Sequence, residues 1–491
     1  MAEHEEIIPG TFWLSDRPGK TVYGRLYLSE DVRLELEGSL TSAMEYQEQT
    51  DAAGNVSIMG SMGDEPDAFT VLGELRDRQS KVSLFECTTV GRSGDWFMSE
   101  DSAQTVVPAY GLRGDHITEP TGLTGMRAEV LHLGVWSQAP GFEMVVFKDG
   151  KCTLTYEEPS EPSVASLSNG AEVQLIFATS VRRPSPTGGG FDRNIGIEVD
   201  GFPTASYRDI ERLYEVPLSS LLTLCLRRGC PVTRMFMRRD DGPWLEAIAP
   251  SLLSAGSEDP EFKPWNHLLM LPDIGLSGVA RWLDNVDRLG ATPPIVARIV
   301  ASSSIQLETD LFSLTSVAEG LHQRLFGAAA APVEKEDAKA IRAATKKALG
   351  DSGFSEEHVQ AVIDALASIS RPSYKKRLAK LREHTLDLVH EVFGNDFKEW
   401  SKEVTDCRND LAHHNIGVIT PEATGVYAAV IYSLRWLLLV TLLLETGISR
   451  DILREKLTGL QPYRLFIQQA PDMLPSVYGE KSADDSGDGE P

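Results

Sequence analysis

The sequence predicts an α+β multidomain protein, in which a β-rich N-terminal region (1–290), an antiparallel sandwich or barrel, precedes an all-α helical bundle (291–470). Short runs of β-forming residues recur through the first region at the spacing of antiparallel strands. After residue 291 the hydrophobic period becomes that of amphipathic helices. The last residues (471–491) are acidic and poor in apolar side chains, which predicts a disordered tail.

The N-terminal region contains a series of predicted strands. Residues 21–29 and 33–40 flank the break Glu30-Asp31 and predict a hairpin. Later runs are AFTVLGEL, KVSLFECTTV, RAEVLHLGVW and EMVVFKDGKCTLTY, and the last contains the hairpin signal Asp149-Gly150. The polar and glycine-rich stretches 51–66 and 184–190 predict flexible loops. Helical spacing first occurs over 207–228, with a predicted break at Pro217.

The helical region shows apolar residues at helical spacing in several segments. They predict a helix over 311–325, two helices over 335–349 and 356–368, and another that begins near Pro372. Residues 428–444 are apolar on nearly every face, but Arg435 interrupts them and Glu445 ends them. This segment predicts the central helix of a bundle or a buried oligomer contact rather than a membrane span.

Composition excludes several function classes. The formal net charge of −25 argues against a protein that coats nucleic acid broadly, although a nuclease with one local basic groove is compatible with it. The five cysteines are too scattered for a disulfide framework, and the first residues lack an apolar stretch. We therefore expect a cytoplasmic protein with no membrane segment. Because glycine-rich phosphate loops and clusters of metal-ligating side chains are lacking, we expect no metal and no cofactor.

One amphipathic helix, within 398–417, carries the candidate chemistry. Trp400, Val404, Cys407 and Leu411 recur at spacings of four, three and four, which predicts one buried stripe. The polar residues off this stripe or at its margin are Arg408, Asn409, Asp410, His413 and His414. The pattern ends after the two histidines, at the helix-stopping residues Asn415, Gly417 and Pro421.

Arg408 and His413 combine two groups that suit phosphodiester chemistry. The guanidinium is a charged planar fork that matches phosphate, and the imidazole exchanges a proton near pH 7. In an ideal helix the two residues differ by roughly 140° in direction and about 7.5 Å in height. They meet on one phosphate only if the helix distorts or a second copy of the chain completes the site. Such pairs also form caps and surface salt bridges, so the spacing leaves both interpretations open.

The helix that begins near Pro372 carries the densest basic cluster, and we expect it to contact phosphates of the substrate: Lys375, Lys376, Arg377 and Lys380, with Arg382 nearby. A solvated helix face explains the same charges equally well. Glu319, Asp410 and His414 are candidate supporting residues, although an ordinary surface carboxylate is the simpler interpretation of Glu319.

The helical region resembles HEPN ribonuclease domains. The resemblance rests on the R-N-x3-H string from Arg408 to His413, on Ala318 to His322, and on the very apolar last helix. The order of parts, with Gly10-Thr11-Phe12-Trp13 near the start, is similar to the ApeA family of bacterial anti-phage proteins. The resemblance implies an abortive-infection ribonuclease that cleaves cellular RNA, with Arg408, Asn409 and His413 as its motif residues. The role of the additional His414 stays open.

Cleavage of RNA without a metal uses the ribose 2′-OH as nucleophile, so it needs a base, an acid and positive charge on the phosphorane. A single motif supplies one histidine, and we therefore predict a homodimer, or a larger oligomer of dimers, with the site at the dimer interface. Structured RNA such as tRNA is the expected substrate, and a phage-derived or small-molecule trigger is expected to bind the β-rich region. Alternatives are a non-catalytic dimerising scaffold that recognises a phage component, and the partner of a nucleotide-transferring antitoxin.

Overall fold

The structure, a computed structural model, divides into two compact units. The β-rich unit comprises Met1–Val135, Ala139–Glu215 and Cys230–Glu261, and the helical unit comprises Trp136–Gln138, Val216–Gly229 and Phe262–Pro491. The structure describes residues 6–29, 31–41, 44–50, 56–62, 66–77, 80–93, 103–139, 142–146, 152–156, 163–185, 188–254, 267–302, 304–327, 333–412 and 420–479.

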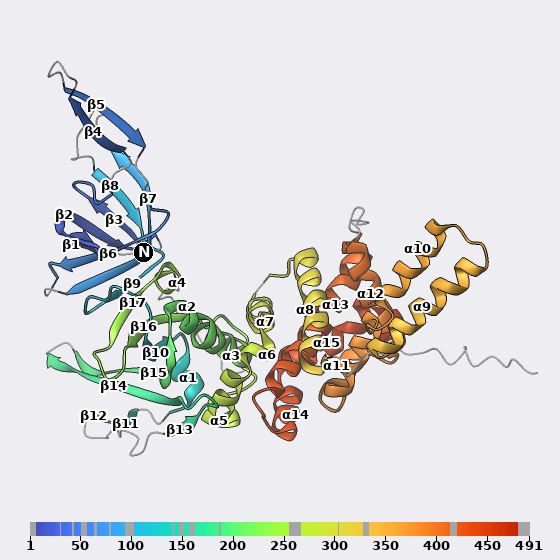
Figure 1. The fold of residues 1–491 in the computed structure, drawn as a ribbon. Coiled ribbons are helices and arrows are strands. Elements are labelled where there is room, and N and C mark those ends of the chain that lie inside the picture. The colour runs from blue at the N-terminus through green and yellow to red at the C-terminus, as the bar shows by residue number, and fades with distance from the viewer. Residues whose placement is uncertain are drawn as a thin grey trace, which may run out of the picture. The chain divides into compact units, whose positions relative to one another are not determined.

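A closed antiparallel barrel forms the first part of the β-rich unit (Figure 1). Its strands follow the order β7-β6-β1-β2-β3-β8, and β8 pairs back onto β7 to close the ring. Their bounds are β1 Glu6–Leu14, β2 Arg17–Leu28, β3 Arg33–Leu36, β6 Phe69–Leu75, β7 Lys81–Ser93 and β8 Ala103–Val107. The predicted antiparallel, barrel-like fold of this region is confirmed, and so is the hairpin predicted over 21–40, since β2 pairs with β3.

Phe12 fills the centre of the barrel and is completely buried. A Cβ atom added at Gly73 would overlap its ring, and one at Gly24 would lie 3.3 Å from it. Small residues on the neighbouring strands therefore make the space that this phenylalanine occupies. Apolar side chains from the other strands, including Leu26, Leu34 and Val82, complete the core.

Beyond β7 the sheet continues as an open antiparallel sheet in the order β9-β17-β16-β10-β15-β14-β13. The bounds are β9 Tyr110–Arg113, β10 Leu123–Val130, β13 Val164–Ser166, β14 Glu172–Ser185, β15 Gly188–Ala205, β16 Val232–Arg238 and β17 Leu245–Ile248. Two separate hairpins join β4 Met44–Thr50 to β5 Val56–Met62, and β11 Phe142–Val146 to β12 Cys152–Tyr156. The second flanks Asp149-Gly150, so that predicted hairpin is confirmed. Short helices α1 Leu133–Ser137 and α4 Pro250–Leu253 accompany the strands.

Three local predictions in this region are wrong. Residues 56–62 of the predicted loop 51–66 form β5, which pairs with β4 in continuous register. The predicted loop 184–190 is the end of the β14–β15 hairpin, where Ser185 pairs with Gly188. A partner strand supplies the backbone hydrogen bonds that these compositions alone did not indicate. Pro217 causes no break: α2 Tyr207–Ile210 and the π-helical turn η1 Glu211–Glu215 lead into α3 Val216–Leu226, whose first turn tolerates proline.

The helical unit is a bundle of α-helices, as the sequence predicts. Its elements after α3 are α5 Leu271–Asp284, α6 Val286–Leu289, α7 Thr292–Ala301, α8 Leu307–Phe326, α9 Lys335–Asp351, α10 Glu356–Ala365, η4 Leu366–Ser368, α11 Tyr374–Val389, η5 His390–Phe393, α12 Phe397–Ala412, α13 Pro421–Leu444, α14 Arg450–Gly459, α15 Gln461–Met473 and α16 Pro475–Tyr478. The predicted boundary near residue 291 lies between α6 and α7, inside the helical unit, whose longest segment begins at Phe262.

The apolar helix α13 passes through this bundle and packs against α7, α8, α11 and α15. The consecutive residues Leu437, Leu438, Leu439 and Val440 point in four different directions and are at most 1% exposed, which explains why the segment is apolar all round. Among the described residues, α13 is the one helix whose length and composition would allow it to cross a membrane, and 78% of its most apolar window is buried inside the protein. The interpretation of this segment as a central bundle helix is confirmed.

The prediction of disorder from residue 471 is wrong for its first part. Residues 471–473 complete α15, and α16 follows. Tyr478 donates a hydrogen bond to the carbonyl of Val392 at 2.7 Å, and Val477 is 1% exposed. This hydrogen bond and the burial of Val477 hold the segment on the bundle. The remainder of the predicted tail, 480–491, lies outside the described residues.

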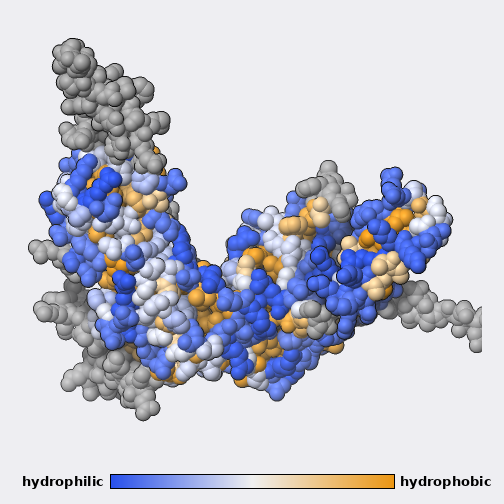
Figure 2. Space-filling view, in the orientation of Figure 1, coloured by the Kyte–Doolittle hydropathy of each residue, from blue (hydrophilic) through white to orange (hydrophobic). Residues whose placement is uncertain are grey.

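The α9–α10 hairpin carries apolar side chains among hydrophilic ones on its surface, as Figure 2 shows. Ile341, Phe354 and Val362 are 37%, 55% and 39% exposed. These two helices pack mainly on each other.

Candidate functional site

Helix α12 positions Arg408 through the stripe that it buries. Trp400 and Val404 are completely buried, and Cys407 and Leu411 are 4% and 8% exposed. The predicted stripe is therefore confirmed. The indole N–H of Trp400 donates to Ser433 Oγ on α13 at 3.1 Å, which fixes how α12 is rotated about its axis. Arg408 follows Cys407 and consequently lies at the margin of the buried face.

The guanidinium of Arg408 is held by two neighbours. Its Nη2 lies 2.9 Å from Glu319 Oε2 on α8. Its Cζ lies 5.0 Å from the centroid of the Tyr374 ring on α11, a cation–π distance. The Arg408 side chain stays 34% exposed. Three helices thus position this group and leave part of it open to solvent.

The Tyr374 ring packs against the guanidinium of Arg408. Its hydroxyl donates to the carbonyl of Thr315 on α8 at 3.1 Å, and burial raises the pKa of this phenol above its ordinary value. A neutral, hydrogen-bonded tyrosine therefore supports the guanidinium. Burial likewise raises the pKa of the adjacent Cys407 thiol to about 12, so this cysteine is not a thiolate at neutral pH.

Arg377 binds the same carboxylate as Arg408. Its Nη2 lies 3.6 Å from Glu319 Oε1, and its Nε donates to the carbonyl of Pro372 at 3.2 Å. With its side chain 9% exposed, Arg377 differs from the predicted outer phosphate contact, because packing of α11 on α8 turns it inward. Two guanidiniums on one carboxylate leave the group Arg377, Glu319 and Arg408 with one net positive charge.

The other basic residues of α11 divide between solvent and packing. Lys375, Lys376 and Lys380 are exposed, and Lys380 Nζ lies 2.8 Å from Glu383 Oε2. Arg382, in contrast, lies with its Cζ 4.8 Å from the Phe397 ring of α12 and serves the packing of the two helices. The lysines remain available to a substrate.

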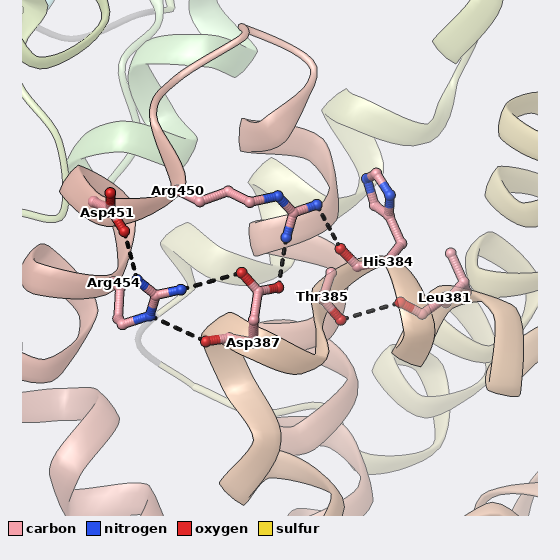
Figure 3. A network of polar contacts seen from close by, with 7 residues as sticks. All are labelled: Leu381, His384, Thr385, Asp387, Arg450, Asp451 and Arg454. Carbon is pink, nitrogen blue, oxygen red and sulfur yellow. Dashed lines mark hydrogen bonds and ion pairs between the residues drawn. The ribbon is translucent and has the colours of Figure 1, made fainter.

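The C-terminal half of α11 is fixed by α14 (Figure 3). Arg450 and Arg454 both contact the carboxylate of Asp387, at 2.6 and 3.2 Å, and Arg450 also donates to the carbonyl of His384 at 2.9 Å. Arg454 reaches the carbonyl of Asp387 at 3.2 Å as well. This network anchors the helix that presents Tyr374, Arg377 and the lysines.

Asn409 and Asp410 lie on α12 next to Arg408 and are exposed. His413, His414 and the predicted continuation of the helix to residue 417 lie outside the described residues, since the described part of α12 ends at Ala412. The structure thus brings Arg408, Glu319 and Arg377 together. Asn409 and Asp410 follow Arg408 on α12.

Sequence reasoning missed that Tyr374 and Arg377 belong to this group. The sequence does not single out Tyr374, and it predicts Arg377 only as one of several phosphate contacts on the helix that begins near Pro372. The signal available in the sequence was their spacing of three, which places both on one face of α11.

Family models match both parts of the chain. A model described as ApeA N-terminal domain 1 matches residues 8–282, more than half of the chain. A model described as Apea-like HEPN matches residues 312–452, a range that contains Glu319, Tyr374, Arg377 and Arg408. No curated protein and no solved structure matches the chain.

Proposed function

The chain belongs to the ApeA family, whose C-terminal part is a HEPN domain of an anti-phage nuclease family, and on that premise we propose that it is an endoribonuclease that cleaves cellular RNA without a metal or another cofactor. The ribose 2′-OH attacks the adjacent phosphate, and the products end in 2′,3′-cyclic phosphate and 5′-OH.

The observation that carries this proposal is the position of Arg408. Its guanidinium is held by Glu319 at 2.9 Å and by the Tyr374 ring, yet it is 34% exposed. An arginine fixed before the substrate arrives loses little entropy when it binds a phosphate, and it stabilises the charge that develops on the phosphorane. Glu319 acts as a positioning residue for Arg408, and Arg377 keeps the local charge positive.

His413 supplies the proton transfer in this proposal, as base at O2′ or as acid at O5′. Asn409 holds the phosphate or orients His413, and Asp410 and His414 are supporting residues. One chain supplies one such motif, so the complete site forms at the interface of a homodimer, or in an oligomer built from dimers.

The substrate contacts extend along α11 in this proposal. Lys375, Lys376 and Lys380 bind phosphates outside the reacting centre. We propose tRNA as the substrate because its cleavage would stop growth of the infected cell. Residues 1–290 act as the recognition and regulatory region, which binds a phage-derived or small-molecule trigger, and residues 291–470 act as the catalytic domain in the cytoplasm.

A non-catalytic scaffold is the second candidate function. Two arginines contact the Glu319 carboxylate, and an ion-paired group of this kind can serve helix packing alone, which favours the scaffold. Growth of bacteria that overexpress the protein separates the two. The nuclease proposal expects growth arrest that His413→Ala abolishes, whereas the scaffold proposal expects the same growth with and without this substitution.

A further inference from the structure

A pocket of about 600 Å³ opens between α8 and α11, and no role has yet been assigned to it. Its size is within the range of pockets that hold small molecules or single nucleotides. Two residues of α8 and five residues on or just before α11 line it: Leu325, Phe326, Pro372, Lys376, Ala379, Lys380 and Glu383.

The pocket lies beside the group that holds Arg408. Along α11, Arg377 is the residue after Lys376 and precedes Lys380 by one turn, so one flank of the helix contacts Glu319 and the next flank opens into the pocket. Along α8, Phe326 follows Glu319 by two turns, about 10 Å. The pocket therefore lies about two helical turns along α8 from the carboxylate that holds Arg408.

The lining chemistry is that of a site for one unpaired nucleotide. Phe326 offers an aromatic face, and Lys380 Nζ lies 6.0 Å from the centre of that ring. Lys376 is exposed at the same rim, and no described carboxylate lies within ion-pair distance of it. Aromatic faces flanked by ammonium groups bind single-stranded nucleic acid through base stacking and phosphate contacts.

We propose that this α8–α11 pocket binds one base of the RNA next to the cleaved phosphodiester, with the base stacked on Phe326 and the adjoining phosphate on Lys376 and Lys380. The place of the pocket beside the reacting phosphate rests on the proposed ribonuclease function. The binding of a nucleotide rests on the lining residues alone.

Two imidazoles hold the Phe326 ring in place. The ring of His322 lies 5.3 Å from it at 53°, and that of His384 lies 5.8 Å from it at 73°. His322 is completely buried, and neither of its ring nitrogens has a hydrogen-bond partner among the described residues. Burial, followed by the charges of Arg377 and Lys380, lowers the pKa of His322 and keeps it neutral. A ring fixed in this way loses little freedom when a base stacks on it.

Glu383 gives the pocket a preference among bases. Its carboxylate, which holds Lys380 Nζ at 2.8 Å through Oε2, accepts further hydrogen bonds through its remaining lone pairs, so it matches the exocyclic amino groups of adenine, cytosine and guanine. Uracil has no amino group, and its one free donor, N3–H, lies between two carbonyl oxygens that the carboxylate repels. The pocket therefore favours an amino-bearing base over uracil.

RNA binding to the full-length His413→Ala variant tests the proposal, because the RNA then stays intact. Fluorescence anisotropy measures the affinity for labelled single-stranded A10, C10 and U10. We expect A10 and C10 to bind more tightly than U10, and Phe326→Ala to weaken A10 binding about tenfold. Phe326→Tyr keeps the aromatic face and the affinity. Glu383→Gln reduces the preference against U10.

Phe312→Ala is the matched control, because Phe312 is a 51% exposed phenylalanine on the same helix. Equal A10 affinity in the His413→Ala protein and in both Phe326 variants made from it would overturn the proposal. So would a His413→Ala protein that binds none of the three RNAs. If Phe326→Ala fails to fold, Lys376→Ala and Lys380→Ala replace it, and each should lower the salt dependence of A10 binding by about one phosphate contact. A wild-type chain that binds A10 through Phe326 but cleaves no RNA contradicts the ribonuclease proposal and leaves the pocket standing.

Discussion

Arg408 on α12 and Glu319 on α8, 89 residues apart in the chain, form an ion pair of 2.9 Å. Glu319 also contacts Arg377 on α11, so one carboxylate joins three helices. Its charge balances one of the two guanidiniums and leaves the other available to an anion. This relationship connects packing of the bundle to the chemistry proposed for it.

Glu319→Gln tests this relationship. The amide keeps the shape of the side chain and removes its charge, which leaves the nearly buried Arg377 without a counter-ion and Arg408 less firmly placed. We expect ribonuclease activity to fall about tenfold and stability to fall by about 1–3 kcal/mol. Cleavage rates and thermal melts measure the two effects. Glu308→Gln, an exposed glutamate on α8, is the control and should change neither.

Arg408→Lys separates charge from geometry. Lysine keeps one positive charge but loses the planar fork that binds two phosphate oxygens. We expect activity to fall about 10²-fold, while stability changes by less than about 1 kcal/mol because the ion pair is partly exposed. Single-turnover cleavage with saturating protein measures the rate. Full activity in Arg408→Lys would show that a point charge suffices and would argue against the proposed phosphate contact.

Glu215 makes the stability of the β-rich unit depend on pH. Burial, followed by repulsion from Glu211, raises the pKa of its carboxyl from 4.5 to about 7, and this side chain is 7% exposed. The folded state therefore holds the proton more tightly than the unfolded chain. The resulting stability is fully present below pH 4.5 and is lost as pH rises through 7.

Glu215→Gln should remove this dependence. We expect the variant to be more stable than the wild type by about 2 kcal/mol at pH 8 and to show little gain at pH 5. Thermal melts at the two pH values measure the difference, with the exposed Glu119→Gln as control. An equal gain at both values would mean that ionisation of Glu215 is not the cause.

Trp400 and Ser433 test the anchoring of α12. Ser433→Ala leaves the buried indole N–H of Trp400 without its acceptor and should cost about 1–3 kcal/mol. In the Trp400→Phe background the same substitution should cost clearly less, since the donor is already gone. Denaturant unfolding of the four proteins measures the coupling. Additive losses would indicate that the hydrogen bond contributes little.

The buried face of α12 could be predicted because it follows from local spacing. Trp400, Val404, Cys407 and Leu411 lie on one side of any helix that this sequence forms, and their burial needs no knowledge of the partner. The ion pair of Arg377 with Glu319 could not be predicted. The spacing of three from Tyr374 places Arg377 on the same face of α11, but its partner on α8 depends on how the two helices pack.

The strand β5 and the end of the β14–β15 hairpin show the same limit in the β-rich unit. Glycine, serine and proline in 51–66 and 184–190 favour loops locally, whereas pairing with a neighbouring strand stabilises extended backbone there. All four pairings are local hairpins, but those of β2 with β3 and of β11 with β12 could be predicted because their β-forming runs flank a clear sequence break, Glu30-Asp31 or Asp149-Gly150.

In the proposed mechanism, Arg408 and His413 together cleave RNA without a metal. Its most direct test incubates purified full-length wild type, Arg408→Ala and His413→Ala with cellular RNA in EDTA and identifies the product ends. We predict cleavage by the wild type alone, with 2′,3′-cyclic phosphate and 5′-OH ends. Cleavage that disappears with the chelator, or that persists in both variants, would rule out this mechanism.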